Sequence, residues 1–234
     1  MIVLFRKELR YFFSSMSGYV FLAVFWAASG VFFTFGMLAA RSGDIKVFFT
    51  AFAPVLMFVL PLLTMRLYAE ERNMRTEELL LSAPMPITFI ILGKYISAMT
   101  VFGIAIAPSL LYPIILAALR APDFLTALGC FTGLILIASA YISLGLFLSV
   151  CTESQTAAAA ATYAVFLLMF LISPQGGMAP SGFLREVAAF ISFTTRFTGF
   201  SYGVFNLADI FYYITVSALF IFLSVFILED RRLS

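Results

Sequence analysis

Charged residues are scarce in this sequence: 11% of its 234 residues are Asp, Glu, Lys or Arg, whereas 63% are hydrophobic, and the mean hydropathy is +1.07. Soluble domains usually carry about 25% charged residues. A soluble chain of this size could not cover its surface with so few charges, so the sequence predicts one integral membrane domain over residues 1–234. The net charge of +2 is too small to indicate nucleic acid as a partner.

Histidine is absent, and the chain has two cysteines, Cys130 and Cys151, which would lie roughly 31 Å apart on one helix. Such a pair fits neither a zinc site nor a thiol redox centre. Without histidine or paired acids in the apolar segments, an enzyme acting within the membrane is disfavoured. A phosphate-binding loop is also missing, because Thr88 stands where Gly93-Lys94 would require a glycine. We therefore expect no catalytic residue, metal or cofactor in this chain; ATP and magnesium, if used, bind a partner ATPase.

Long apolar runs are what the sequence does contain. Six of them reach or approach the roughly 20 residues that cross a 30 Å hydrocarbon core. They cover residues 18–40, 47–66, 89–119, 124–150, 155–173 and 208–228. Pro108 and Pro113 predict a kink in the third run, and Pro54 and Pro61 make the second irregular. The expected fold class is an all-α integral membrane protein with six transmembrane helices.

Residues 1–17 precede the first run and have an amphipathic pattern. Apolar residues recur at helical spacing, at Ile2, Phe5, Leu9 and Phe12. The charged residues between or beside them are Arg6, Lys7, Glu8 and Arg10. This pattern predicts an interfacial helix, with its apolar face among the acyl chains and its basic groups near anionic headgroups. The simpler alternative is a positively charged flank that only orients the first span.

Basic residues are unequally divided between the two sides of a six-span arrangement. Nine of the fourteen fall on the side of both termini: Arg6, Lys7, Arg10, Arg66, Arg72, Arg75, Lys94, Arg231 and Arg232. The other side holds Arg41, Lys46, Arg120, Arg185 and Arg196. The positive-inside rule therefore predicts cytoplasmic termini and a cytoplasmic segment at 66–88. Residues 174–207 would then lie outside, where we expect one or two short helices that are re-entrant or lie on the surface.

Thr64–Pro84 concentrates charge between the second and third spans, with four carboxylates and three arginines. Glu71 and Arg75 are spaced to pair on a helix, and Thr76 followed by acids is typical of a helix start. We expect a helix, a break near Asn73–Arg75 and then a second helix. The alternative is an ordinary solvated hairpin between two spans.

The run LTMR-x-x-AEER-x-x-x-T-x-ELLLSAP, followed by ILGKY, resembles the cytoplasmic segment of ABC-2-type transporter permeases. The closest resemblance is to the branch of gliding-motility and copper-processing permeases. FRKELRYFFSS near the start and RFTGFSYGVFNLADIFYY near the end extend it over essentially the whole chain. Three residues depart from the family pattern: Met16 replaces a common proline, Arg75 a usual glycine and Arg196 a frequent histidine.

This resemblance implies a permease subunit of an ATP-driven exporter in the bacterial cytoplasmic (inner) membrane. The implied partners are two cytoplasmic ABC ATPase subunits, a second permease copy or paralogue, and the lipid bilayer. In the family, the segment that matches Arg66–Leu81 forms a coupling helix that sits in a cleft of the ATPase. The implied ATPase-coupling residues are Arg66, Glu70, Glu71, Arg72, Thr76, Glu77 and Glu78, and the entry helix around Lys7, Glu8 and Arg10 would assist.

Two other functions remain open. One is a membrane scaffold that anchors a cytoplasmic complex without transporting anything. The other, disfavoured by the missing catalytic groups, is an enzyme acting on lipid-linked substrates. Secondary transport is weakly supported, because the predicted spans contain almost no ionisable group at mid-depth. If the chain does transport, its Phe- and Leu-rich spans favour a lipid-like, polymeric or hydrophobic cargo over a small ion.

Overall fold

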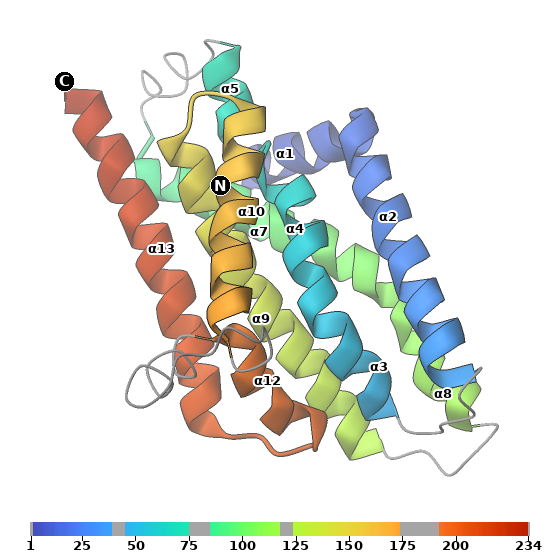
Figure 1. The fold of residues 1–234 in the computed structure, drawn as a ribbon. Coiled ribbons are helices and arrows are strands. Elements are labelled where there is room, and N and C mark those ends of the chain that lie inside the picture. The colour runs from blue at the N-terminus through green and yellow to red at the C-terminus, as the bar shows by residue number, and fades with distance from the viewer. Residues whose placement is uncertain (1, 39–44, 75–84, 118–123, 174–191, 234) are drawn as a thin grey trace.

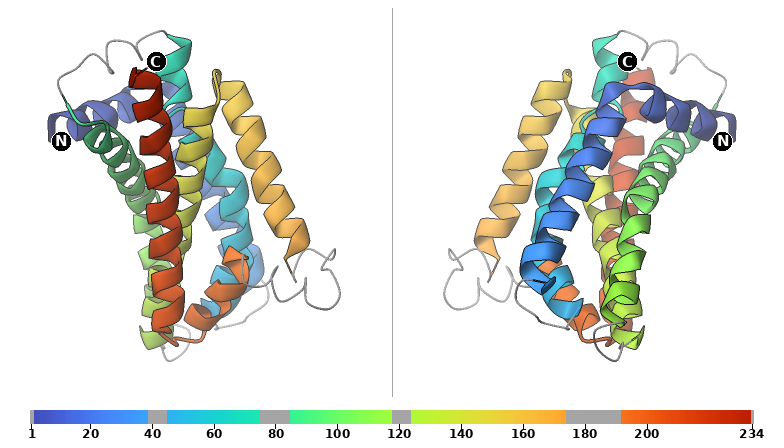
Figure 2. Two further views of the ribbon diagram at one scale, coloured as in Figure 1. Left: turned by 90° about the vertical axis from the view of Figure 1, so that its left-hand side faces the viewer. Right: turned by 90° about the vertical axis from the view of Figure 1, so that its right-hand side faces the viewer.

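The computed structural model describes residues 2–38, 45–74, 85–117, 124–173 and 192–233, and helices make up most of them. Six helical stretches are long and apolar enough to cross a membrane: Met16–Gly36, Ile45–Asn73, Ile87–Leu116, Leu125–Cys151, Gln155–Ile172 and Leu207–Arg232. The predicted all-α, multi-pass membrane protein is thereby confirmed. Both chain termini lie at one end of the bundle (Figures 1 and 2), which we call the α1 end.

α1 (Ile2–Ser14) lies across this end of the bundle, at a steep angle to the spans (Figures 1 and 2). It forms where the amphipathic pattern predicts a helix, and it packs against α7 and α2. α2 (Met16–Phe33) starts directly after the extended Ser15 and continues into a π-helical turn, Thr34–Leu38. The corner requires a glycine at position 18, because a Cβ there would lie 2.1 Å from the Phe12 carbonyl oxygen.

Pro54 and Pro108 interrupt the second and third spans as predicted, whereas Pro61 and Pro113 lie inside the helices Leu56–Thr64 and Leu111–Ala117. The second consists of α3 (Ile45–Phe52), a 3₁₀ turn (Ala53–Val55) that contains Pro54, and α4 (Leu56–Thr64). The third consists of α7 (Ile87–Ile106), a 3₁₀ turn (Ala107–Leu110) that contains Pro108, and α8 (Leu111–Ala117). Next to the second interruption, the Trp26 indole N–H donates to the Ala105 carbonyl at 2.9 Å. Neighbouring helices therefore supply hydrogen bonds where a span is irregular.

α9 (Phe124–Cys151) is the central helix of the bundle (Figure 1). It packs against α3, α4, α7 and α10 (Gln155–Ile172), and also against the two helices near the end of the chain. Most of its span is buried inside the protein, whereas α10 is largely exposed at the bundle edge (Figure 2). α9 is therefore the element whose ends fix the position of the neighbouring loops.

The segment predicted to lie outside contains one described helix, α12 (Phe193–Ser201), before α13 (Leu207–Leu233). With nine residues, α12 is too short to span, in agreement with the expected short helix. It packs against α9, and Arg196 pairs with Asp209 of α13 at 2.7 Å. The rest of the predicted external segment, residues 174–191, lies outside the described residues.

Candidate functional site

α5 (Ala69–Asn73) is a five-residue helix at the α1 end, and it begins the charged segment between the second and third spans. Turns at residues 65–68 separate it from α4. Tyr68 and Ala69 are fully buried and Glu70 is 9% exposed, so this part is not a solvated hairpin. α5 ends at Asn73, where the sequence predicts a break, and the predicted second helix falls outside the described residues.

Ser149 of α9 fixes the turn that leads into α5. Its hydroxyl oxygen accepts the backbone N–H groups of Tyr68 at 3.1 Å and of Ala69 at 2.9 Å. The same hydroxyl donates to the Met65 carbonyl at 3.4 Å. One side chain thus satisfies two backbone donors of a buried turn, which would otherwise cost free energy.

A glycine four residues earlier on α9 lets α4 approach closely enough for these bonds. A Cβ on Gly145 would lie 2.3 Å from Oγ1 and 2.7 Å from Cβ of Thr64, the last residue of α4. Any side chain at position 145 would therefore push α4, and the turn after it, away from α9.

On its other side, α5 joins a buried cluster of charges contributed by α1 and α7. Lys94 of α7 is 1% exposed, and its Nζ lies 2.9 Å from Glu71 Oε2 and 3.2 Å from Glu8 Oε1. The Tyr68 ring lies 5.9 Å from the same nitrogen. A buried ammonium is tolerated only when it is paired and hydrogen-bonded, and here carboxylates from two different elements pair with it. The cluster therefore connects α1, α5 and α7 through one cation.

Tyr11 provides a second link between α1 and α5. Its hydroxyl donates to Glu70 Oε1 at 2.5 Å. Burial raises the pKa of Tyr11 to about 12, helped by the hydrogen bond to Glu70, because both favour the neutral phenol. Lys7, one turn before Tyr11, lies 3.9 Å from Glu71. Both carboxylates of α5 thus face α1.

The remaining charge of α5, Arg72, points toward the loop between α9 and α10. Its guanidinium lies 2.8 Å from Glu153 Oε1 and 3.5 Å from the Thr152 carbonyl. Glu153 is 81% exposed, so this ion pair is in water, unlike the pairs of Lys94. α5 is therefore held from two sides, by buried charges and by the end of α9.

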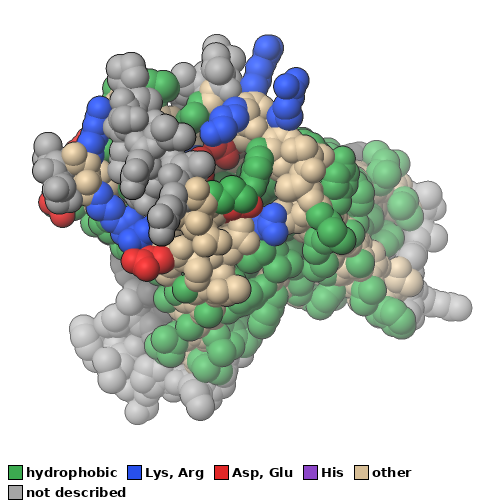
Figure 3. Space-filling view, turned by 90° about the horizontal axis from the view of Figure 1, so that it is seen from above, with side chains coloured by type: hydrophobic (Ala, Val, Ile, Leu, Met, Phe, Trp, Pro, Cys, Tyr) green, Lys and Arg blue, Asp and Glu red, His purple; other side chains and the backbone are tan. Residues whose placement is uncertain are grey.

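A pocket of about 220 Å³ lies between α1 and the α4–α5 turn. Among the described residues, these line it: Lys7, Glu8, Tyr11, Phe12, Ser15, Ser17, Arg66, Leu67, Glu70, Glu71, Met74 and Lys94. Three of these are cationic and three are carboxylates. Seen from the α1 end, charged side chains gather on this face of a mostly apolar molecule (Figure 3). In the described part of the chain, no group of three or more Cys, Asp or Glu residues could hold a metal.

The structure brings together most of the residues that the sequence singled out. Glu71 and Glu8 meet on Lys94, Glu70 bonds Tyr11 next to them, and Arg66 and Lys7 line the adjoining pocket. Glu8 is buried, although the amphipathic pattern places it on the polar face. Arg6 and Arg10 are exposed on α1, as expected. Thr76, Glu77 and Glu78 lie outside the described residues, so their role stays a prediction.

Four residues of the site escaped the sequence reasoning: Lys94, Tyr11, Ser149 and Glu153. Lys94 carried a signal, since a lysine inside an apolar span needs a buried partner or a functional reason. Its position near the start of the span also fits a charge in the preceding loop, and this hides the signal. The other three carry no such signal: serine and tyrosine are common in apolar helices, and Glu153 lies in an ordinary loop.

Comparison with protein families identifies the family of this chain. A family model described as ABC-2 family transporter protein matches residues 38–228, which is more than half of the chain. The matched range includes α5, Lys94 and the end of α9, whereas α1 precedes it. A search of curated proteins finds no match.

Proposed function

The chain belongs to the ABC-2 transporter family, and from this premise we propose that it couples ATP hydrolysis by a separate cytoplasmic ATPase to export across the membrane. Membership makes the chain an ABC permease-type membrane component that associates with ABC ATPases. Export, the number of ATPase subunits and pairing with a second permease copy or paralogue belong to the proposal. We also propose that the α1 end faces the cytoplasm, because nine of fourteen basic residues lie on that side of the six spans.

One observation carries the proposal: α5 is tied to three other elements by side chains that cannot move independently. Lys94 joins it to α7 and, through Glu8, to α1, while Ser149 joins its first turn to α9. A force applied to the segment after α5 would therefore reach several spans at once. A flexible loop between two spans would instead absorb such a force.

The energetics also favour this arrangement. ATP binding to the partner can shift the conformation of the permease only if the partner makes different contacts with the two conformations of the permease. A segment held by buried, paired charges has few alternative arrangements, because separating a buried pair leaves uncompensated charge. The segment therefore moves as a unit with α1 and α7 or does not move at all.

The residues divide into two groups in this proposal. Glu70 and Glu71 are engaged inside the protein, and we assign them to the junction rather than to the ATPase surface. Arg66 and Arg72 flank the junction. Thr76, Glu77 and Glu78 are the proposed direct contacts with the ATPase, and Lys7, Glu8 and Arg10 support the segment from α1.

Co-purification with the cognate ATPase tests the proposal. Changing both Glu77 and Glu78 to Ala should lower ATP hydrolysis by the reconstituted complex at least about tenfold, which corresponds to ~1.4 kcal/mol. The matched control changes Glu229 and Asp230, two exposed acids near the end of α13, to Gln and Asn. Unchanged ATPase binding and hydrolysis in the Glu77→Ala/Glu78→Ala variant would show that these residues are not the contact.

The same preparation separates transport coupling from the scaffold alternative. A scaffold binds the ATPase but leaves its turnover independent of the permease conformation. For a scaffold, cross-linking α5 to the loop after α9 should have no effect on hydrolysis. The cross-link joins Arg72→Cys and Glu153→Cys, in a chain whose native cysteines are replaced by serine, through a reducible thiol-reactive reagent, because the two positions meet only at the tips of long side chains. A coupled permease should lose hydrolysis on cross-linking and recover it when the reagent is reduced.

A further inference from the structure

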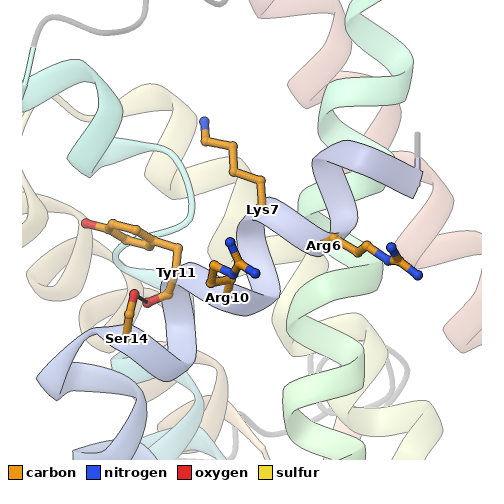
Figure 4. A pocket seen from close by; sticks show the side chains of 5 residues that line it. All are labelled: Arg6, Lys7, Arg10, Tyr11 and Ser14. Atoms are coloured by element: carbon orange, nitrogen blue, oxygen red, sulfur yellow. Dashed lines mark hydrogen bonds between the residues drawn. The ribbon is translucent and has the colours of Figure 1, made fainter.

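A second hollow lies along α1, and it shares Lys7 and Tyr11 with the pocket beside the buried cluster. Its volume is about 740 Å³, and five residues of α1 line it: Arg6, Lys7, Arg10, Tyr11 and Ser14. Positions 6, 10 and 14 are four apart and share a face of the helix, whereas Lys7 and Tyr11 lie on the adjacent face. In Figure 4 the Arg6 side chain points away from Tyr11. The coupling proposed above assigns no role to Arg6.

The charges of α1 are sorted between its two sides. Glu8 is buried and pairs with Lys94, so the only acidic residue of α1 is turned toward the bundle. Arg6 and Arg10 are exposed, and no carboxylate of the described residues lies within 4.0 Å of either guanidinium. Lys7 is 60% exposed, and its Nζ lies 3.9 Å from Glu71 Oε1, which is long for an ion pair. The described lining of the hollow is therefore cationic, with the acids of this region engaged elsewhere.

The hollow also lies at a defined depth. α1 crosses the bundle where the apolar spans end (Figure 2), so its side chains are at the level of the headgroups. α2 starts two residues after Ser14, and its first turn exposes Met16 at 83% and Tyr19 at 58%. Cationic and hydroxyl groups are thus followed along the chain by apolar surface that faces the acyl chains. A polar region next to an apolar surface suits a ligand with an anionic head and an apolar tail better than a soluble anion.

We propose that this hollow binds the phosphate of an anionic phospholipid, with Arg6 and Arg10 as its principal ligands and Lys7 and Ser14 beside them. Guanidinium groups suit phosphate because their N–H donors can bond two oxygens at once. The bound lipid would hold α1 against the headgroup layer while Glu8 and Tyr11 hold it to α7 and α5. This inference does not depend on coupling to an ATPase, and the two can fail separately.

Lipid retention in nanodiscs tests the proposal with the full chain. Wild-type protein in nanodiscs of mixed phosphatidylglycerol and phosphatidylcholine should retain phosphatidylglycerol preferentially after extraction, as measured by native mass spectrometry. Each basic residue near an anionic surface contributes about fivefold in affinity, so Arg6→Gln/Arg10→Gln should lower this preference about 25-fold. Arg231→Gln/Arg232→Gln, which removes two charges from the last turn of α13 at the same end, is the matched control and should keep it.

A third variant distinguishes phosphate geometry from net charge. Arg6→Lys/Arg10→Lys keeps both charges but removes the paired N–H donors, and it should lose part of the preference, between wild type and the glutamine variant. Equal loss in the α13 control would show a general surface effect and overturn the proposal. Displacement of the lipid by millimolar inorganic phosphate would also overturn it, because the site would then recognise free phosphate. An unchanged preference for phosphatidylglycerol in Arg6→Gln/Arg10→Gln would also overturn the lipid proposal. This holds even if the same variant loses ATPase binding.

Discussion

The two sides of α5 are held by different kinds of interaction. Toward α1 and α7, Glu71 pairs with Lys94, which is 1% exposed, and Glu70 accepts a hydrogen bond from the half-exposed Tyr11. Toward α9 and α10, one serine bonds the backbone, and one arginine pairs with a glutamate that is 81% exposed. Burial makes the pair between Lys94 and Glu71 costly to break, whereas the exposed ion pair of Arg72 contributes little to stability.

The largest effect should follow removal of the buried cation. Lys94→Met leaves Glu8 and Glu71 buried without their positive partner, and we expect a loss of stability of about 3–5 kcal/mol. The unfolding midpoint of the purified chain in detergent measures it. Adding Glu8→Gln and Glu71→Gln removes the two unpaired negative charges and should restore much of the lost stability. If the single variant is as stable as the triple variant, the cluster does not hold α5.

A smaller effect is expected at the α9 side. Ser149→Ala leaves the N–H groups of Tyr68 and Ala69 without their acceptor in a buried turn, at a cost of about 1–3 kcal/mol. Ser143→Ala is the matched control, because Ser143 lies on the same helix and bonds the carbonyl of Ala140 within that helix. Thermal unfolding of both variants makes the comparison. Equal destabilisation would mean that Ser149 acts only by filling space.

Tyr11→Phe should cost less, about 1 kcal/mol, since it removes one hydrogen bond to Glu70 from a half-exposed site. Its specific signature is in the pH dependence. The pKa of Tyr11 is raised from 10 to about 12 in the folded protein, so its contribution is complete below pH 10 and is lost as the pH rises to about 12. The difference in unfolding midpoint between wild type and variant should therefore shrink over this range. A difference that stays constant from pH 9 to 12 would contradict the raised pKa.

The smallest effect belongs to the exposed pair. Glu153→Gln should change stability by about 0.2–0.5 kcal/mol at low salt, and by less at high salt, where screening weakens the pair. Unfolding midpoints at two ionic strengths measure it. A loss as large as that of Ser149→Ala would remove the proposed difference between buried and exposed contacts.

The sequence predicted the spans well, and the site only in part. Apolar runs of about 20 residues and proline positions are local features, so the six spans and the interruptions at Pro54 and Pro108 could be read directly. The sequence singles out Glu70 and Glu71 as contacts for an ATPase, and that role stays a prediction. Their actual neighbours, Tyr11 and Lys94, are distant in sequence or lie in another span, and no local pattern indicates such pairs.

A six-span, all-α membrane protein with a charged segment between its second and third spans follows from the amino-acid sequence. Composition and the length of the apolar runs suffice for that, because each span must satisfy its own backbone hydrogen bonds in lipid. Which charges are buried depends on the packing of the helices. Lys94 and Glu8 are 86 positions apart, and they meet only because α1 folds across the end of the bundle onto α7. Burial depends on the packing of all the neighbours, and so it is a property of the assembled bundle.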